Sequence, residues 1–239
     1  MSPLLQTKGL SRHFGGIVAV DSVNFTLAEG ELRCLIGPNG AGKSTFFKMI
    51  SGQLTPSSGT VLLEGRVISG LSPHLVARMG IGIKTQVPSL FDGLSVYEHM
   101  RLAARRHLEQ TRATRLIDEL LISNELVPLA RSKVGQLSHG QRQWVELAMV
   151  IAAEPRIILM DEPTAGMTRE ETIRTAKLIE RIRPGRTLIV VDHDMHFVRT
   201  IAQTVTVFHQ GRILAEGTMD EILKSVVVRD VYLGRHSHV

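Results

Sequence analysis

Short apolar runs along the chain predict a series of strands. Residues 4–36 are expected to form short strands, and within them Val23–Leu27 alternates apolar and polar residues with a period of two. That alternation is typical of a strand with one buried face. Further strands are expected at short, mostly apolar runs, namely Leu32–Ile36, Thr60–Leu63, Ile81–Lys84, Ile157–Met160 and Thr187–Val191. Val205–Phe208 and Arg212–Ala215, joined by a Gln-Gly turn, are expected to form a hairpin.

Segments with helical periodicity lie between these strands. Residues 95–123 contain two amphipathic segments, and Ser95 with Glu98 has the spacing of a capping box at the start of the first. Thr218 and Glu221 have the same spacing and predict a last helix. The remaining expected helices are 44–50, 73–79, 142–153 and 169–183. Strands that alternate with helices in this way fit an α/β fold.

A glycine-rich loop separates the expected strand Leu32–Ile36 from the helix that follows it. Its sequence fits the phosphate-loop pattern G-x-x-x-x-G-K-[ST], with the residues Gly37, Pro38, Asn39, Gly40, Ala41, Gly42, Lys43, Ser44 and Thr45. The glycines allow backbone N–H groups to close on a phosphate chain, and the helix N-terminus favours an anion there. Lys43 is expected to reach the β- and γ-phosphates, and the Ser44 hydroxyl to contact Mg²⁺. The strand–loop–helix context therefore predicts nucleotide binding.

Two carboxylates follow the apolar run Ile157–Met160. Asp161 and Glu162 would lie at the carboxyl end of a buried strand, where open α/β sheets bind ligands. After a phosphate loop, Asp161 has a natural role at Mg²⁺, and Glu162 could accept a proton from an attacking water. The second polar strand end, Asp192-His193-Asp194, is not expected to form a metal site, because its side chains do not converge on one point.

Three loop segments are ambiguous by themselves. Phe14, next to a Gly-Gly turn, fits either a core or turn residue or a stacking platform for a purine ring. The run Leu137-Ser138-His139-Gly140-Gln141 precedes a helix and fits either a plain N-cap or an anion-binding turn. Gln86 lies just beyond the strand Ile81–Lys84 and alone indicates nothing.

Composition fits a globular protein and gives little sign of a nucleic-acid surface. The chain has 239 residues, of which 43% are apolar and 21% charged, enough for a substantial core. The net charge of +5 is mild and aromatic residues are only 4%, whereas nucleic-acid surfaces combine clustered Lys and Arg with aromatics. The single Cys34 cannot form an intrachain disulfide, which suits a reducing compartment. No apolar run reaches the length of a bilayer span and no signal peptide is visible, so membrane association is expected to come through a partner.

Taken together, these segments resemble the ATP-binding subunit of ATP-binding-cassette (ABC) transporters over nearly the whole chain. The most specific likeness is Leu137–Gln141 upstream of Ile157–Glu162, because other P-loop classes lack it. The resemblance implies a P-loop NTPase (RecA-like) α/β core with an antiparallel β subdomain and an inserted α-helical subdomain. The implied division of this single nucleotide-binding domain, residues 1–239, is core plus β subdomain at 1–86 and 157–239, and helical subdomain at 87–156.

The resemblance also implies catalytic and metal-binding roles. Gln86 is similar to the Q-loop glutamine, which touches Mg²⁺ or water and senses the permease. Glu162 is similar to the general base, and His193 to the switch histidine that contacts the γ-phosphate. Asp161, with Ser44 and Gln86, would hold Mg²⁺.

The nucleotide contacts are implied in the same way. Gly37–Thr45 would bind the phosphates, and Phe14 is similar to the aromatic that stacks on adenine. The signature turn, whose residues are Leu137, Ser138, His139, Gly140 and Gln141, would face the γ-phosphate bound by another subunit. His139 departs from the common glycine of this turn, and Thr168 stands where the loop after the general base usually has Asp. The first departure is expected to be tolerated if the side chain points away from nucleotide, and the second concerns communication between subunits.

The function implied is ATP hydrolysis that powers solute import through separate membrane permease subunits. ATP and Mg²⁺ would be sandwiched in a homodimer, or in a heterodimer with a related ATPase subunit, at the cytoplasmic face of the membrane. A solute-binding protein would be an indirect partner, and no nucleic acid is expected. Segments such as Ile81–Gln86 and Val231–Gly234 are most similar to importers of urea and, nearly as much, of branched-chain amino acids. The end Arg235–Val239 is expected to fray.

The alternatives each lack a feature that they need. A soluble non-transport ABC ATPase acting on chromosomes would have long coiled-coil arms, but residues 46–136 show no sustained heptads. A ribosome-associated one usually has two cassettes in a chain. A small-molecule kinase would not need the signature turn or His193. An inactive regulatory cassette is disfavoured by intact Lys43, Glu162 and His193.

Overall fold

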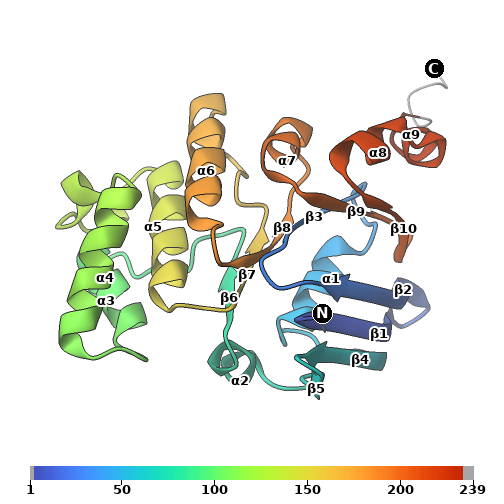
Figure 1. Cartoon of the computed structure of the whole chain (residues 1–239), viewed down its shortest axis with the longest axis horizontal. Helices are drawn as coiled ribbons and strands as arrows, with labels where there is room; N and C mark the ends of the chain where they lie inside the picture. Colours follow the sequence, from blue (N-terminus) through green and yellow to red (C-terminus); the bar gives the residue numbers. More distant parts are fainter. Residues whose placement is uncertain (1–2, 234–239) are drawn as a thin grey trace.

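The computed structural model describes residues 3–233, which form two β-sheets flanked by helices (Figure 1). The larger sheet has the strand order β10-β9-β3-β8-β7-β6. Its strands in chain order are β3 (Leu32–Ile36), β6 (Ile81–Lys84), β7 (Ile157–Asp161), β8 (Thr187–Val191), β9 (Thr204–His209) and β10 (Arg212–Gly217). All neighbouring pairs are parallel except β9 with β10. Because parallel strands end at one edge of a sheet, the loops after β3, β6, β7 and β8 meet there.

The smaller sheet is antiparallel, with the strand order β2-β1-β4-β5. Its strands are β1 (Leu5–Phe14), β2 (Ile17–Leu27), β4 (Ser58–Leu63) and β5 (Arg66–Val67). The alternation expected over Val23–Leu27 is confirmed, since every second side chain from Val23 onward is buried. The expectation of only short strands before β3 is wrong, because β1 and β2 have 10 and 11 residues. Register shifts along this pair mark irregularities at which such long strands can bend.

Helix α1 (Lys43–Ile50) packs between the two sheets. The ring of Phe46 lies 5.3 Å from that of Phe25 on β2 and 5.2 Å from that of Phe208 on β9. All three side chains are buried, and burying a phenylalanine contributes about 1.5–3 kcal/mol. This contact holds the loop that precedes α1 against both sheets.

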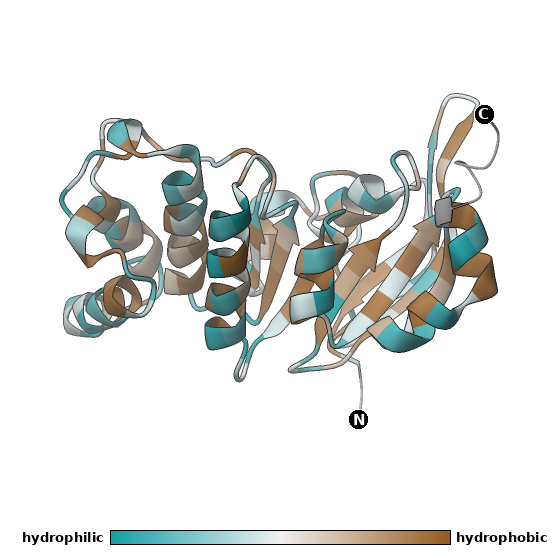
Figure 2. Ribbon diagram, turned by 90° about the horizontal axis from the view of Figure 1, so that it is seen from above, coloured by the Kyte–Doolittle hydropathy of each residue, from teal (hydrophilic) through white to brown (hydrophobic). Residues whose placement is uncertain are grey.

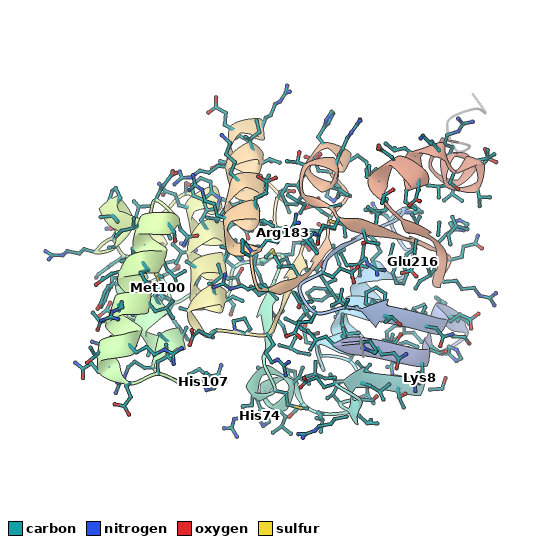
Figure 3. All side chains as sticks on the ribbon, viewed as in Figure 1. Lys8, His74, Met100, His107, Arg183 and Glu216 are labelled. Atoms are coloured by element: carbon teal, nitrogen blue, oxygen red, sulfur yellow. The ribbon has the colours of Figure 1, made fainter. Side chains whose placement is uncertain are left out.

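The other helices lie at one end of the molecule and on the face of the large sheet opposite α1, except for the helix that contains Val76, which lies on the α1 side and shares a core with Phe46 and Phe47. They are α2 (Pro73–Arg78), α3 (Val96–Ala104), α4 (Gln110–Ser123), α5 (His139–Ala152), α6 (Arg169–Ile182), α7 (Met195–Ile201), α8 (Met219–Lys224) and α9 (Val226–Leu233). Helices α3, α4 and α5 gather at one end, left in Figure 1, where Met100 is fully buried (Figure 3). Figure 2 shows apolar residues concentrated on the strands and hydrophilic residues on the outer helix faces.

Several helix predictions need correction. The helix expected from Arg142 begins at His139, because a capping box between Ser138 and Gln141 starts it earlier. It is buried on nearly all sides, because it lies between α3, α4 and the sheet. The predicted last helix is two helices, broken at Ser225, and α7 was not expected at all. The end Arg235–Val239 lies outside the described residues.

Candidate functional site

The glycine-rich loop between β3 and α1 can only be built with glycine at key positions. Gly37 and Gly42 have φ angles of 151° and 102°. A Cβ on Gly37 would lie 2.3 Å from the carbonyl oxygen of Phe208, and one on Gly42 would lie 2.5 Å from that of Ala19. These contacts lie below van der Waals distance to backbone atoms, so a side chain at either position would displace the loop. Glycine at these two positions therefore lets the loop backbone pack directly against β9 and β2.

The side chain of Lys43 folds back over this loop. Its Nζ donates to the carbonyl oxygens of Gly37 at 2.6 Å and Pro38 at 3.0 Å, and the residue is buried. Burial lowers the pKa of Lys43, and the neighbouring carboxylates of Glu162 and Asp161 oppose that shift. No acidic residue lies in the first turn of α1, so the positive end of the helix dipole faces the loop without a local carboxylate.

The two acids at the end of β7 occupy different environments. Burial, and then the negative charge of Glu162, raise the pKa of Asp161, while Lys48, Lys84 and Lys43 lower it. A carboxylate is the kind of oxygen ligand that Mg²⁺ prefers. Glu162 has a left-handed backbone, with a φ of 44°, and its N–H donates to Val191 on β8 at 2.8 Å. This unusual conformation for a non-glycine residue directs the Glu162 side chain away from the strand direction.

The three predicted catalytic residues come together although they follow three different strands. Gln86, after β6, donates from Nε2 to Oε2 of Glu162 at 2.7 Å. His193, after β8, places Nδ1 3.7 Å from Oε1 of Glu162. The carboxylate therefore has an amide on one oxygen and an imidazole near the other. The geometry brings the predicted group together, and their catalytic roles remain predictions.

Asp192 is an organising residue that sequence reasoning missed. It is fully buried, and Oδ2 accepts from the Thr164 hydroxyl at 2.7 Å. Oδ1 accepts from the backbone N–H groups of His193 at 2.7 Å and Asp194 at 2.9 Å. These bonds fix the turn that presents His193 and tie it to the segment after Glu162. The sequence does indicate an acid at a strand end, but Asp192 was considered there only as a possible metal ligand.

The ring of Phe14 lies at the turn between β1 and β2 and is 46% exposed. A core role is therefore excluded, and the turn and stacking interpretations both remain. The Arg12 guanidinium lies 4.7 Å from the ring centroid. The same hairpin contacts the phosphate loop, since Ala19 is the neighbour of Gly42.

The signature turn forms the N-terminus of α5, away from the phosphate loop. The Ser138 hydroxyl accepts from the Gln141 N–H at 3.3 Å, and the Gln141 side chain accepts from the Ser138 N–H at 3.0 Å. A Cβ on Gly140 would lie 2.2 Å from Oε1 of Glu171, so a larger residue there would displace the Glu171 side chain. Within residues 3–233 no hydrogen bond joins this turn to Gly37–Thr45, and α5 and α1 are well separated in Figure 1.

The two unusual residues lie at one junction. His139 Nε2 lies 3.0 Å from the carbonyl oxygen of Ala165 and 3.3 Å from Gln143 Nε2. Thr168 caps α6 through a capping box with Glu171, the residue that packs against Gly140. His139 and Thr168, the two departures from the family pattern, therefore both lie where the start of α5 contacts the segment before α6.

Comparison with known proteins identifies the family of the chain. A family model described as "ABC transporter" matches residues 20–165. The chain belongs to this family. It is 33% identical over 250 residues to BraF, a high-affinity branched-chain amino acid transport ATP-binding protein of Pseudomonas aeruginosa, covering 97% of this chain and 98% of BraF. It is 36% identical over 241 residues to LptB, a lipopolysaccharide export system ATP-binding protein of Acidithiobacillus ferridurans, covering 98% of each.

A solved ABC cassette has the same fold. The dimeric post-hydrolysis structure of MJ0796 bound to ADP and Pi matches with a TM-score of 0.79 and 26% identity, covering 90% of this chain and 98% of that one. The ABC chain described here is thus an ATP-binding, ATP-hydrolysing transporter subunit with the P-loop NTPase fold. None of the helices described between residues 3 and 233 has the length and apolar character of a membrane span.

Proposed function

We propose that this ATPase subunit works in a pair, with each ATP enclosed between the phosphate loop of one subunit and the signature turn of the other. The observation that carries the proposal is the division of the site in one chain. Gln86, Glu162 and His193 gather on one side, while Ser138–Gln141 has no hydrogen bond to the phosphate loop of its own chain. A second copy or a related subunit would supply the missing half. The dimeric MJ0796 cassette bound to ADP and Pi supports this arrangement.

Hydrolysis in this pair depends on the orientation of Glu162. Its carboxylate takes the proton of the attacking water, and the amide of Gln86 holds it in position. His193 lies on the other carboxylate oxygen, on a turn fixed by Asp192. Lys43 and the loop N–H groups stabilise the negative charge that develops on the phosphate oxygens. Phe14 stacks on the adenine.

Mg²⁺ fits the donor set beside the loop. Asp161 offers a carboxylate whose raised pKa reflects burial and an adjacent like charge, both of which a divalent cation would relieve. The exposed Ser44 hydroxyl and the Gln86 amide oxygen complete the proposed ligands. When bound, the metal ion neutralises phosphate charge in the transition state.

The proposed permease contact lies between the core and the helices that make up residues 87–156, the proposed helical subdomain. A hollow of 690 Å³ opens there between α2, β6, α3 and α5. His74 and His107 face it from α2 and from the segment after α3 (Figure 3). β6 forms part of its lining and ends two residues before Gln86, so a peptide seated there would contact the strand that precedes the glutamine. Val87 and Phe91, in the segment after β6, are 77% and 69% exposed and do not line this hollow. The subunit would then sit on the cytoplasmic face of the membrane through its permease.

The solute is proposed as a branched-chain amino acid or urea. Full-length similarity to BraF favours amino acids, the sequence likeness described above favours urea, and the similarity to LptB shows that export systems share these cassettes. A soluble ABC ATPase acting on nucleic acid or ribosomes has no specific observation in its favour.

The test is to purify the tagged chain in detergent with the subunits that accompany it and reconstitute the complex in liposomes. We expect two permease subunits of one operon, and ATP-dependent accumulation of labelled leucine or labelled urea once the matching solute-binding protein is added. Recovery of a ribosome or nucleic acid in place of a permease would refute the proposal. ATP-dependent movement of lipid out of the membrane would refute its import component.

A further inference from the structure

A buried polar cluster lies beneath the loop that carries Gln86. Lys84, the last residue of β6, meets Gln143 and Glu146 of α5, and the three residues are only 1%, 1% and 2% exposed. Lys84 Nζ lies 3.8 Å from Oε2 of Glu146, and that oxygen has no hydrogen-bond partner. Burial lowers the pKa of Lys84 to about 8 and raises the pKa of Glu146. Because the desolvation of such a pair offsets its Coulomb attraction, the cluster is poorly explained as a device for stability.

The cluster binds the backbone on both sides of Gln86. Lys84 Nζ donates to the carbonyl oxygen of Thr85 at 3.2 Å and to Oε1 of Gln143. Gln143 Nε2 donates to the carbonyl oxygen of Gln86 at 2.9 Å. Oε1 of Glu146 accepts from the Thr85 hydroxyl at 3.2 Å and from the Ser89 N–H at 3.0 Å. The segment 85–89 is otherwise exposed or half-buried and has no regular secondary structure.

The same helix carries the signature turn. Gln143 lies one turn after His139, whose Nε2 is 3.3 Å away, and His139 in turn reaches Ala165 three residues after Glu162. One side chain on α5 therefore touches both the Gln86 backbone and the first residue of the helix. A movement of α5 relative to the sheet would therefore displace the backbone of Gln86.

We propose that Gln143, supported by Lys84 and Glu146, is a positioning residue that sets the Gln86 amide against Glu162. The three side chains form a clamp that makes the hydrolytic geometry depend on the placement of α5. The inference rests on the proposed roles of Gln86 and Glu162.

The test uses Gln143→Glu in the full chain. This change keeps the oxygen that accepts from Lys84 and removes the N–H that Gln143 donates to Gln86. We expect kcat to fall about tenfold, in the range usual for residues that orient a catalytic group, with the KM for ATP unchanged. In a Gln86→Ala background, Gln143→Glu should cause no further loss, because the group that it positions is already absent.

Thr175→Val is the matched control. The Thr175 hydroxyl, on α6, accepts from Trp144 Nε1 of α5 at 2.9 Å. The substitution therefore removes a buried hydrogen bond of α5 on a side that does not face Gln86. It should lower the melting temperature and leave kcat unchanged. If Gln143→Glu lowers stability like this control but retains full kcat, the clamp is only structural and the inference is wrong. The same holds if its loss adds fully to that of Gln86→Ala. Normal hydrolysis by Glu162→Gln would instead show that the proposed function itself fails.

Discussion

The ionised carboxylate of Asp161 lowers the stability of the folded chain when no ligand is bound. Burial and the adjacent Glu162 raise its pKa, so the folded chain binds its proton more tightly than the unfolded chain. Folding stability from this group is therefore present at acid pH and falls as pH rises through the raised pKa. Residues at active sites commonly keep such unfavourable charges because the ligand requires them.

We predict that Asp161→Asn raises the melting temperature of the nucleotide-free chain at pH 7 and abolishes Mg²⁺-dependent hydrolysis. The gain should shrink as pH is lowered toward 4, because the native carboxyl is then protonated and resembles the amide. Thermal melts from pH 4 to 8 with and without Mg²⁺ measure both effects. A variant that is less stable than the parent at pH 7 would contradict this account of the charge.

At the residue scale, sequence patterns predicted the chemistry better than the contacts. Lys43 was predicted from the phosphate-loop pattern and Glu162 from its place after an apolar strand, whereas the role of His193 was implied only by the resemblance to ABC transporter subunits. Asp192 and Gln143 could not be predicted, because their importance lies in bonds to backbone atoms far away in sequence. The local sequence of a buried polar residue does not say which carbonyl or hydroxyl it will meet.

Helix α5 is the element on which most of the proposed mechanism depends. Its N-terminus carries the signature turn, its second turn carries Gln143, and its last turns pack beside the hollow proposed for the permease. A rigid helix can link these three positions because its own backbone bonds do not need to change. The capping box at Ser138 fixes where this element begins.

We predict that Ser138→Ala costs about 1 kcal/mol of stability through loss of the N-cap. It should also weaken ATP-driven pairing, because the same hydroxyl is proposed to face nucleotide on the partner. Thr218→Ala removes the equivalent cap from α8 and is the control. Chemical unfolding and ATP-dependent sedimentation compare the two variants. Equal effects on pairing would mean that the signature hydroxyl acts only as a cap.

Element boundaries were predictable where an apolar run is bounded by turn residues, as for β6, β7 and β8. They were not predictable where tertiary contacts decide. The start of α5 depends on a cap at Ser138, which begins the helix three residues before the expected Arg142, and α7 is a short helix capped by Asp194. The long β1 and β2 strands tolerate irregular pairing that obscures their period.

At the scale of the whole molecule, the parallel sheet brings four loops to one edge. The phosphate loop and the loops of Gln86, Glu162 and His193 meet there, so the proposed half of an ATP site is assembled from residues that are up to 156 positions apart. The fold leaves the signature turn elsewhere, on a helix at the other side of the sheet. Under the proposed function, such a division makes hydrolysis conditional on association with a second subunit.

The most direct measurement is the association state of Glu162→Gln with Mg²⁺ and ATP, by sedimentation and by counting bound nucleotide. We predict a stable pair that retains one ATP per subunit, with hydrolysis reduced about 10²–10⁴-fold by loss of the general base. The same variant carrying Lys43→Ala should remain monomeric because it cannot hold the phosphates. A Glu162→Gln chain that stays monomeric and hydrolyses ATP at the normal rate would contradict both the shared site and the role of Glu162.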